Sequence, residues 1–448
     1  MSAPAAHADA RPELLPRMPW RVGPDAGTRH TGVPRGVRIC LIVALSLLPL
    51  LQPAGPANTS IVDLAIGVLV LAVGWWAWQT RRLTHLPYLL GMGLMMLAGA
   101  FAAWRAEVGS GGLVLLQDGS VLLWGAAITM VALAGVGARA LLLRAFCWSG
   151  TAWAGVLVLG RVTGVDTLAG ITAADGKRAS LTFGDPNLAA NYFLTVIFLL
   201  AASRAIPRLW LRVPAMLLVL TAIVLTGSNG GMLGLIGGAL VAVPLGVGRV
   251  RGALAGVGVA AGLGLTVVLL GPHVSLSGLT DGSASQAQVI RDSVGRSDQS
   301  SESREALWRE ELRLWGTSDL VGVGPAQTRS VLRTSGAPYV KEAHTDYLGT
   351  LVERGLLGGI GLIVLMVTVA TRASRVRADR LVPRPELIAG LLVAMAISAV
   401  FYEVLHFRHL WFVLGLVAGL DAALQRQPVA HWLTPQKRRV PRRRRWPR

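Results

Sequence analysis

Long apolar runs recur along the whole chain and decide what it can fold into. About twelve of them approach the roughly 20 residues that an α-helix needs to cross a membrane. They lie near residues 38–54, 60–78, 84–104, 117–138, 141–160, 187–203, 209–227, 229–248, 252–271, 346–370, 386–405 and 408–424. With 53% hydrophobic and only 15% charged residues, the chain has too little polar surface for an ordinary soluble domain. The sequence therefore predicts an all-α polytopic membrane protein.

The positive charges give an independent test of this topology. When the N-terminus is placed inside and the spans alternate, the inner segments collect most of the 43 lysines and arginines. The net charge of +19 then follows from the topology, and no nucleic-acid partner is needed to explain it. The basic ending QKRRVPRRRRWPR fits a segment that rests on the anionic headgroups of the bilayer. We expect both termini on the cytoplasmic side.

The spans divide the chain into five parts. We expect a disordered cytoplasmic leader at 1–37, transmembrane helices one to nine at 38–271, a large extracytoplasmic loop at 272–345, helices ten to twelve at 346–424, and a basic cytoplasmic tail at 425–448. The two cysteines fall inside apolar spans, and no histidine or carboxylate cluster has metal-ligand spacing, so neither a metal site nor a cofactor is expected.

Ionisable residues are rare inside the predicted spans. Asp63 and Glu403 are the chief exceptions, and each lies near a predicted outer end. An ion-coupled transporter normally keeps titratable groups near the bilayer midplane. The pattern therefore favours chemistry on the outer face over transport.

Two outer segments carry candidate binding residues. In DGKRASLTFGDPNLAANYFL, the adjacent cations Lys177 and Arg178 lie on the side where cations are scarce, which makes an anionic ligand an alternative to a simple turn, and Asn187 is a candidate N-cap for the next helix. In LTGSNGGMLGLIGG, residues 225–238, Asn229 and the first glycines let backbone amides approach a ligand. For the later glycines of that hairpin, close helix packing is the favoured interpretation.

The large outer loop contains a predicted amphipathic helix, SDQSSESREALWREELRLWG. Trp308, Leu312 and Trp315 are spaced to share one face, and Gly316 is a stop signal; the tryptophans are typical interfacial anchors. Arg304 lies in the first turn, where a cation opposes the helix dipole. Neighbouring glutamates can offset this cost, but a phosphate bound at the helix N-terminus would offset it better.

The segment VKEAHTDYLGTLVERGLLGG, residues 340–359, introduces the tenth span. Thr345 is a candidate N-cap, which puts His344 at the positive end of the helix dipole, where the neutral imidazole required of a general base is favoured. Asp346 and Glu353 are seven residues apart and share a face, from which they could orient His344, bind a sugar hydroxyl or merely solvate the first turns. A loop histidine taken alone is usually an ordinary surface residue.

Four of these motifs, in this order, resemble the bacterial O-antigen ligase and O-antigen polymerase superfamily of membrane glycosyltransferases. The resemblance rests on SREALWREELRLWGTSDLVGVGPAQ and EAHTDYLGTLVERGLLG, with weaker matches in FGDPNLAANY and TGSNGGMLGL. It implies a GT-C-type fold in the bacterial inner membrane. It also implies a polyprenyl-diphosphate-linked glycan as donor and a saccharide or glycolipid as acceptor.

The resemblance also assigns roles to residues. Arg304 would hold the diphosphate, His344 would accept the proton of the acceptor hydroxyl, and Arg178 would lie beside the same anionic group. Two positions depart from the family pattern: Asn229 stands where the family usually has arginine, and Thr345 stands where it commonly has asparagine. The loss of one cation weakens the implied phosphate site, and Lys177 or Arg178 could compensate.

We therefore expect a metal-independent glycosyl transfer that inverts the anomeric centre. Two alternatives to this transfer stay open from the sequence. A flippase or transporter of a lipid-linked saccharide would share the outer basic cleft but would need a hydrophilic path across the bilayer. A non-catalytic scaffold of envelope assembly would tolerate changes at Arg304 and His344.

Overall fold

The computed structural model describes residues 32–52, 59–81, 85–107, 111–171, 178–247, 297–318, 320–336 and 345–425. Within these ranges the regular structure is helical, and no β-strand occurs. The helices are α1 (Arg35–Leu47), α2 (Ile61–Gln79), α3 (Leu89–Arg105), α4 (Gly111–Leu133), α5 (Val136–Thr163), α6 (Asp166–Ala169), the 3-10 turn η2 (Leu181–Phe183), α7 (Pro186–Ala202), α8 (Leu209–Thr226), α9 (Asn229–Val247), α12 (Ser297–Thr317), α13 (Thr328–Thr334), α14 (Asp346–Arg375), α15 (Glu386–Ser398) and α16 (Arg408–Gln425).

Each predicted span coincides with one of these helices, except 252–271, which lies outside the described residues. Among the described residues, six helices are long and apolar enough to cross a membrane, namely α2, α4, α5, α8, α9 and α14; α3, α7 and α15 are shorter apolar helices. The chain is therefore an all-α, multi-pass membrane protein by length and composition. The count of about twelve spans and the GT-C-type arrangement stay predictions.

Several predicted boundaries were misplaced by five residues or more, among them the end of the eleventh span, which was expected at residue 405 but lies at Ser398. The first span was expected to end at residue 54, but α1 ends at Leu47, two residues before Pro49, because a proline has no N–H group to continue the helical hydrogen bonds. The fourth span was expected to begin at residue 117, but α4 begins at Gly111. Asp118 consequently lies in the second turn of a helix and not at its end.

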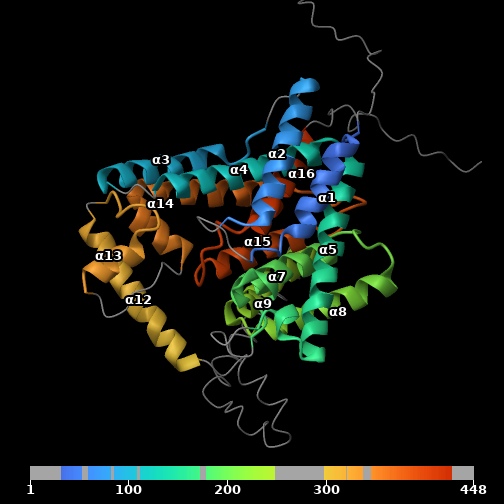
Figure 1. The fold of residues 1–448 in the computed structure, drawn as a ribbon. Coiled ribbons are helices and arrows are strands. Elements are labelled where there is room, and N and C mark those ends of the chain that lie inside the picture. The colour runs from blue at the N-terminus through green and yellow to red at the C-terminus, as the bar shows by residue number, and fades with distance from the viewer. Residues whose placement is uncertain are drawn as a thin grey trace, which may run out of the picture.

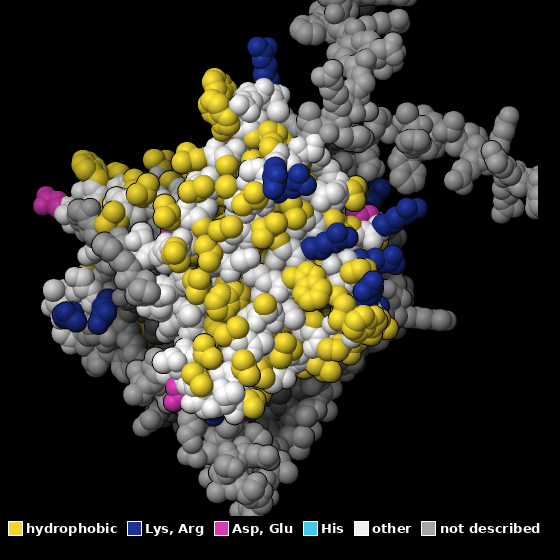
Figure 2. Space-filling view, turned by 45° about the vertical axis from the view of Figure 1, so that its right-hand side comes forward, with side chains coloured by type: hydrophobic (Ala, Val, Ile, Leu, Met, Phe, Trp, Pro, Cys, Tyr) yellow, Lys and Arg dark blue, Asp and Glu magenta, His cyan; other side chains and the backbone are white. Residues whose placement is uncertain are grey.

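Outward-facing side chains are apolar, as the membrane environment requires. On α2, Leu64, Leu71 and Trp78 are 70% exposed or more and follow one another at seven-residue intervals along one face. Figure 2 shows hydrophobic side chains scattered over most of one face of the molecule, with lysine and arginine side chains gathered toward its right-hand part. This exposed apolar surface is suited to contact with lipid.

Glycines allow the helices to pack closely in three pairs. Gly91 of α3 lies against the backbone of Leu365 in α14, Gly238 of α9 against Gly390 of α15, and the same relation holds between α4 and α16. Helices in lipid associate largely through such close backbone contact. The packing role predicted for the later glycines of the 225–238 hairpin, Gly234, Gly237 and Gly238, is thus confirmed. Figure 1 shows α3, α4 and α14 side by side as one layer.

The predicted amphipathic helix is present as α12, but its buried face differs from the prediction. Leu307 and Leu314 are buried and form a small core with Leu332 of α13 and Val352 of α14, whereas Leu312 is 52% exposed. Trp315 packs against this core from its side. The prediction of the buried face was wrong because α12 packs on α14. Contact with protein, and not with a membrane surface, determines which face of α12 is buried.

Candidate functional site

A break in α14 organises the candidate site. The helix runs from Asp346 to Arg375, but Gly355 has φ of 65° and ψ of −164°, which interrupts the helical path. The segment 320–324 lies against the break: the N–H groups of Val323 and Gly324 donate to the carbonyls of Val352 and Glu353 at 2.8 and 3.1 Å, and the N–H of Leu356 donates to the carbonyl of Leu320 at 2.8 Å. Backbone groups that the interrupted helix leaves unpaired are therefore satisfied by a neighbouring loop.

Two glycines make this contact possible. Gly322 has φ of 96°, and a Cβ there would lie 2.6 Å from the nitrogen of Gly355. A Cβ on Gly355 would collide with the carbonyls of Leu320 and Val321. The sequence pieces DLVGVGP and VERGLLG thus fit each other backbone to backbone, and only glycine allows both the approach and the positive φ.

Asp346 and Glu353 fasten the first part of α14 to two different loops. Asp346 is 6% exposed, and its Oδ2 accepts the N–H groups of Val404 and Leu405 at 2.7 and 3.1 Å. Glu353 accepts from the N–H of Ala326 and the hydroxyl of Thr328, both at 2.9 Å. Of the three roles considered for these carboxylates, mere solvation of the protruding turns is excluded, because each carboxylate holds a specific loop in place.

A buried ionic network crosses the bundle at the same level. Arg354, which directly precedes the break, pairs with Asp118 of α4 at 2.7 Å, and both side chains are at least 94% buried. His406 lies 3.5 Å from the other oxygen of Asp118 and 3.8 Å from Glu403, whose side chain is 41% exposed. The network therefore leads from a buried arginine to a carboxylate at the surface.

His406 is an imidazolium in this setting. Burial by itself lowers its pKa, but the hydrogen bonds and charges of Asp118 and Glu403 outweigh that effect and raise the pKa from 6.5 to about 10. A carboxylate faces each ring nitrogen, which suits the form with two N–H donors. His406 thus carries positive charge at neutral pH.

The sequence-predicted cation Arg178 lies where three segments meet. Its Nε donates to the carbonyl of Thr226 at the end of α8 at 3.0 Å, and its Nη2 donates to the Oδ1 of Asn187 at 2.9 Å. Asn187 was expected to cap α7, but Asp185 is the N-cap and accepts the N–H of Asn187 at 2.7 Å, with Pro186 as the first helical residue. Two of the predicted binding residues are therefore in direct contact.

The loop between α15 and α16, residues 399–407, joins these parts. Tyr402 from this loop lies 3.0 Å from the hydroxyl of Ser228, in the hairpin that Arg178 also contacts. The same loop supplies the amides that bind Asp346, and it carries His406 and Glu403. Only Glu403 of this loop was singled out from the sequence, and the organising role of the loop was not predicted.

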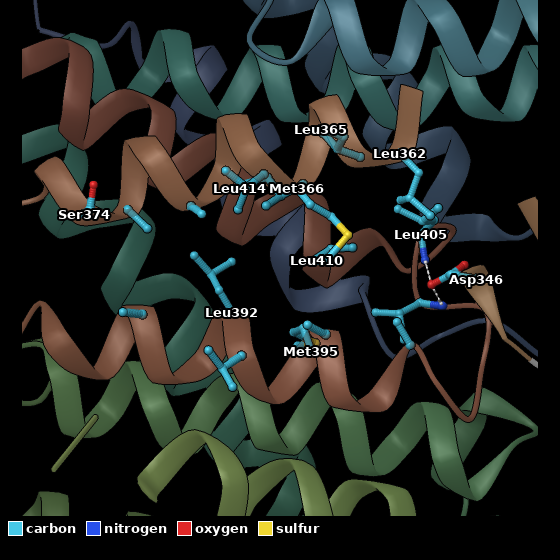
Figure 3. A pocket seen from close by; sticks show the side chains of 18 of the residues that line it. Asp346, Leu362, Leu365, Met366, Ser374, Leu392, Met395, Leu405, Leu410 and Leu414 are labelled. Atoms are coloured by element: carbon cyan, nitrogen blue, oxygen red, sulfur yellow. Dashed lines mark hydrogen bonds between the residues drawn. The ribbon is translucent and has the colours of Figure 1, made fainter. Parts of the chain in front are cut away.

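An apolar groove runs between α14 and α15 with this loop at one end. It has a cavity volume of about 590 Å³ and extends from Asp346, Val404 and Leu405 to Ser374 and Glu386. Figure 3 shows Asp346 and its hydrogen bonds at one end of the groove and Ser374 at the other, with leucine and methionine side chains between them. The groove is thus polar at its ends and hydrocarbon-like along its length.

The remaining predicted residues stand as follows. His344 and Lys177 lie outside the described residues. Arg304 belongs to α12, whose backbone the structure describes at that position but whose side chain there it does not. Asn229 is the first residue of α9 and is exposed. Thr345 does occupy the N-cap position of α14, although its side chain makes no capping hydrogen bond.

The statement that ionisable residues are nearly absent from the spans needs correction. Asp118 and Arg354 are deeply buried within helices, and Arg408 makes a two-pronged pair with Asp63 at 2.8 Å. These pairs could have been suspected from the sequence, because opposite charges lie inside separate apolar runs. Charged residues are costly in lipid unless they pair. Within the described ranges, no group of three or more His, Cys, Asp or Glu residues could hold a metal ion.

Comparison with known proteins gives one family match. Residues 214–363 match the family model described as O-Antigen ligase. The matched region begins in α8, includes Asn229, Arg304 and His344, and ends in α14 beyond the break at Gly355. A search of curated proteins finds no match.

Proposed function

The chain belongs to the O-antigen ligase superfamily, and from this we propose that it transfers or polymerises a polyprenyl-diphosphate-linked glycan on the outer face of the bacterial inner membrane. The acceptor is a saccharide or glycolipid of the cell envelope. The proposed transfer is metal-independent and inverts the anomeric centre.

The groove between α14 and α15 is the observation that carries this proposal. A polyprenyl donor needs an apolar path for its chain and a polar place for its diphosphate at the membrane surface. The groove offers about 590 Å³ of mostly apolar space and ends at the loop 399–407, beside the interlocked motifs. A polyprenyl chain inside the bilayer is already out of water, so the groove favours a lipid-linked donor through close packing of the chain against hydrocarbon side chains.

The diphosphate is expected to lie near the outer end of that groove. Arg178 is fixed between Asn187 and the carbonyl of Thr226, and Tyr402 links the same hairpin to the groove end. Together with Arg304, and with Lys177 as a further cation, Arg178 supplies positive charge for the departing group. Fixed cations of this kind stabilise a leaving diphosphate as its negative charge develops.

The proposed chemistry is a single displacement. The acceptor hydroxyl attacks the anomeric carbon of the donor sugar, the bond from that carbon to the phosphate oxygen breaks, and polyprenyl diphosphate leaves with the electron pair. His344 takes the hydroxyl proton. Asp346 and Glu353, proposed from the sequence as sugar ligands, act instead by holding the loops that frame this site.

The first test is release of polyprenyl diphosphate by the purified protein, supplied with its lipid-linked glycan and acceptor in lipid nanodiscs. His344→Ala and Arg304→Ala should each lower the release rate by a hundredfold or more, on the scale of about 10²–10⁴ for a general base. Arg313→Ala is the matched control, because Arg313 lies on the same helix, is exposed and pairs only locally with Glu310. Equal rates in all variants would remove the site assignment.

A second test addresses the groove. Ala370→Trp places a large ring in the groove wall, while Ile363→Trp places the same ring on a 61% exposed position of the same helix. The first variant should lower transfer from a full-length polyprenyl donor about tenfold, since a ring that displaces part of the chain needs to cost only about 1.4 kcal/mol of packing for that effect. It should affect a short-chain donor much less. Equal effects of both variants on both donors would contradict the groove assignment.

A transporter remains the competing function, and the outcome of the first assay separates the two. Translocation of the lipid-linked saccharide without any release of polyprenyl diphosphate would favour transport. The buried charges found in the bundle are paired with each other near one end of α14, which fits a framed surface site better than a hydrophilic path.

A further inference from the structure

A second pocket lies at the opposite end of α14. It has a volume of about 250 Å³ and is bounded by the last turns of α14 and α16 and by the segment that precedes α3. His85, Thr371, Arg372, Arg375, Asp421 and Gln425 provide its polar lining. None of these residues belongs to the proposed transfer site.

This end of the molecule is strongly basic. The loop that follows α14 meets the end of α7, since the N–H of Arg204 donates to the carbonyl of Leu381 at 2.8 Å. Arg139 pairs with Asp379 of the same loop at 3.7 Å. Clustered arginines mark the cytoplasmic ends of membrane helices, where anionic lipids are also concentrated.

The pocket contains one more positive charge than its own carboxylate can balance. Arg372 lies 3.4 Å from Asp421, and its guanidinium carbon is 5.4 Å from the ring centre of Tyr88. Its Nε is buried and has no hydrogen-bond partner within the described part of the chain. Arg375 is exposed and forms no ion pair with any described residue. Among the described residues that line the pocket, two arginines and one aspartate leave a single positive charge, which a monoanion would neutralise.

An apolar strip leads directly into the pocket. Ile363 and Val367 of α14 are 61% and 59% exposed, and they continue at four-residue intervals into Thr371 and Arg375. Residues four apart lie one above another on the same helix face. A ligand seated here would therefore meet hydrocarbon along one part of its length and cations at the other.

We propose that this pocket binds the headgroup of an anionic phospholipid of the cytoplasmic leaflet, with one acyl chain along Ile363 and Val367. Arg375 and the partly exposed guanidinium of Arg372 contact the phosphate diester, and the single negative charge of that diester balances the pocket. A free phosphate would satisfy the cations but would leave the adjoining apolar strip without a role.

Native mass spectrometry of the full-length protein in detergent can test this proposal. The protein is incubated with equal amounts of phosphatidylglycerol and phosphatidylcholine that carry the same acyl chains, and the bound lipid is measured. Retention of phosphatidylglycerol should exceed that of phosphatidylcholine. Arg375→Gln should lower phosphatidylglycerol retention about fivefold, the effect expected for one arginine near an anionic lipid.

Arg377→Gln is the matched control, because Arg377 is an exposed arginine two residues further on that does not line the pocket. It should leave retention unchanged. Val367→Gln interrupts the apolar strip at an exposed position and should also weaken retention without disturbing the charges. Equal retention of both lipids, equal loss in the two arginine variants, or displacement of phosphatidylglycerol by inorganic phosphate at equal concentration would each overturn the proposal.

Discussion

The two halves of α14 differ in almost every property except their helical backbone. The polar half, Asp346–Arg354, reaches three other segments through charged side chains. The apolar half, Leu356–Arg375, packs through glycine against α3 and forms one wall of the groove. The break at Gly355 divides them. One span thus serves both as a frame for a polar site and as a membrane-spanning element.

This division follows from how each environment treats polar groups. In the hydrocarbon region an unpaired polar group is costly, so the apolar half makes its contacts by close packing. The polar half can hold loops by hydrogen bonds because each of its carboxylates finds specific donors. Precision at the candidate site therefore depends on a few side chains, and the predictions below test that dependence.

Removing Arg354 should be the most damaging change. Arg354→Ala leaves Asp118 buried without its closest counter-charge, and breaking such a pair typically costs about 3–5 kcal/mol. We expect a large loss of thermal stability in detergent and loss of transfer activity. The double variant Asp118→Leu with Arg354→Met removes both charges and should recover much of the stability but not the activity. A double variant as unstable as the single one would show that the pair is not the source of the loss.

Adding a side chain at the break in α14 should have the second-largest effect. Gly355→Ala forces a side chain into a left-handed conformation, at about 1–2 kcal/mol, and against the carbonyls of Leu320 and Val321. We expect the free energy of unfolding, measured by thermal unfolding, to fall by about 2–4 kcal/mol in total. Limited proteolysis should detect the detachment of α12 and α13. Gly93→Ala is the control, since a Cβ there meets nothing within 4 Å. If both variants behave alike, the contact between 320–324 and the break is unimportant.

Weakening a single loop contact should have a smaller effect. Glu353→Gln keeps the shape of the side chain but presents an amide group where one of the two donors requires an acceptor. We expect the free energy of unfolding to fall by about 1–2 kcal/mol. The rate of transfer should fall more than the affinity for the donor. Thr371→Ala changes an exposed hydroxyl of the apolar half that bonds to its own helix and does not line the groove, so it should change neither the free energy of unfolding nor the rate of transfer.

The sequence predicted the helices and their approximate ends well but the site only in part. Apolar runs of membrane-spanning length are a local property, and most of them became helices. The buried face of α12 was predicted wrongly because its partner, α14, is distant in the sequence. The pairing of Asp118 with Arg354 depends likewise on how α4 and α14 pack, which no local pattern encodes. The contact of Arg178 with Asn187 was closer to prediction, because nine residues separate the two.

The pH dependence of stability that comes from His406 should be the smallest of these effects, and it tests the contrast between the two halves of α14. The folded state raises the pKa of His406 from 6.5 to about 10, so its stabilising contribution is complete below pH 6.5, declines as the pH rises, and is absent above about pH 10. The slope cannot exceed about 1.4 kcal/mol per pH unit for one proton, and partial exposure of the ring reduces it. Thermal unfolding measured from pH 6 to pH 10 should therefore fall more steeply for the parent than for His406→Gln. Parallel curves would mean that the imidazolium does not hold the polar half in place, and the contrast between the two halves of α14 would then rest on Arg354 and the carboxylates alone.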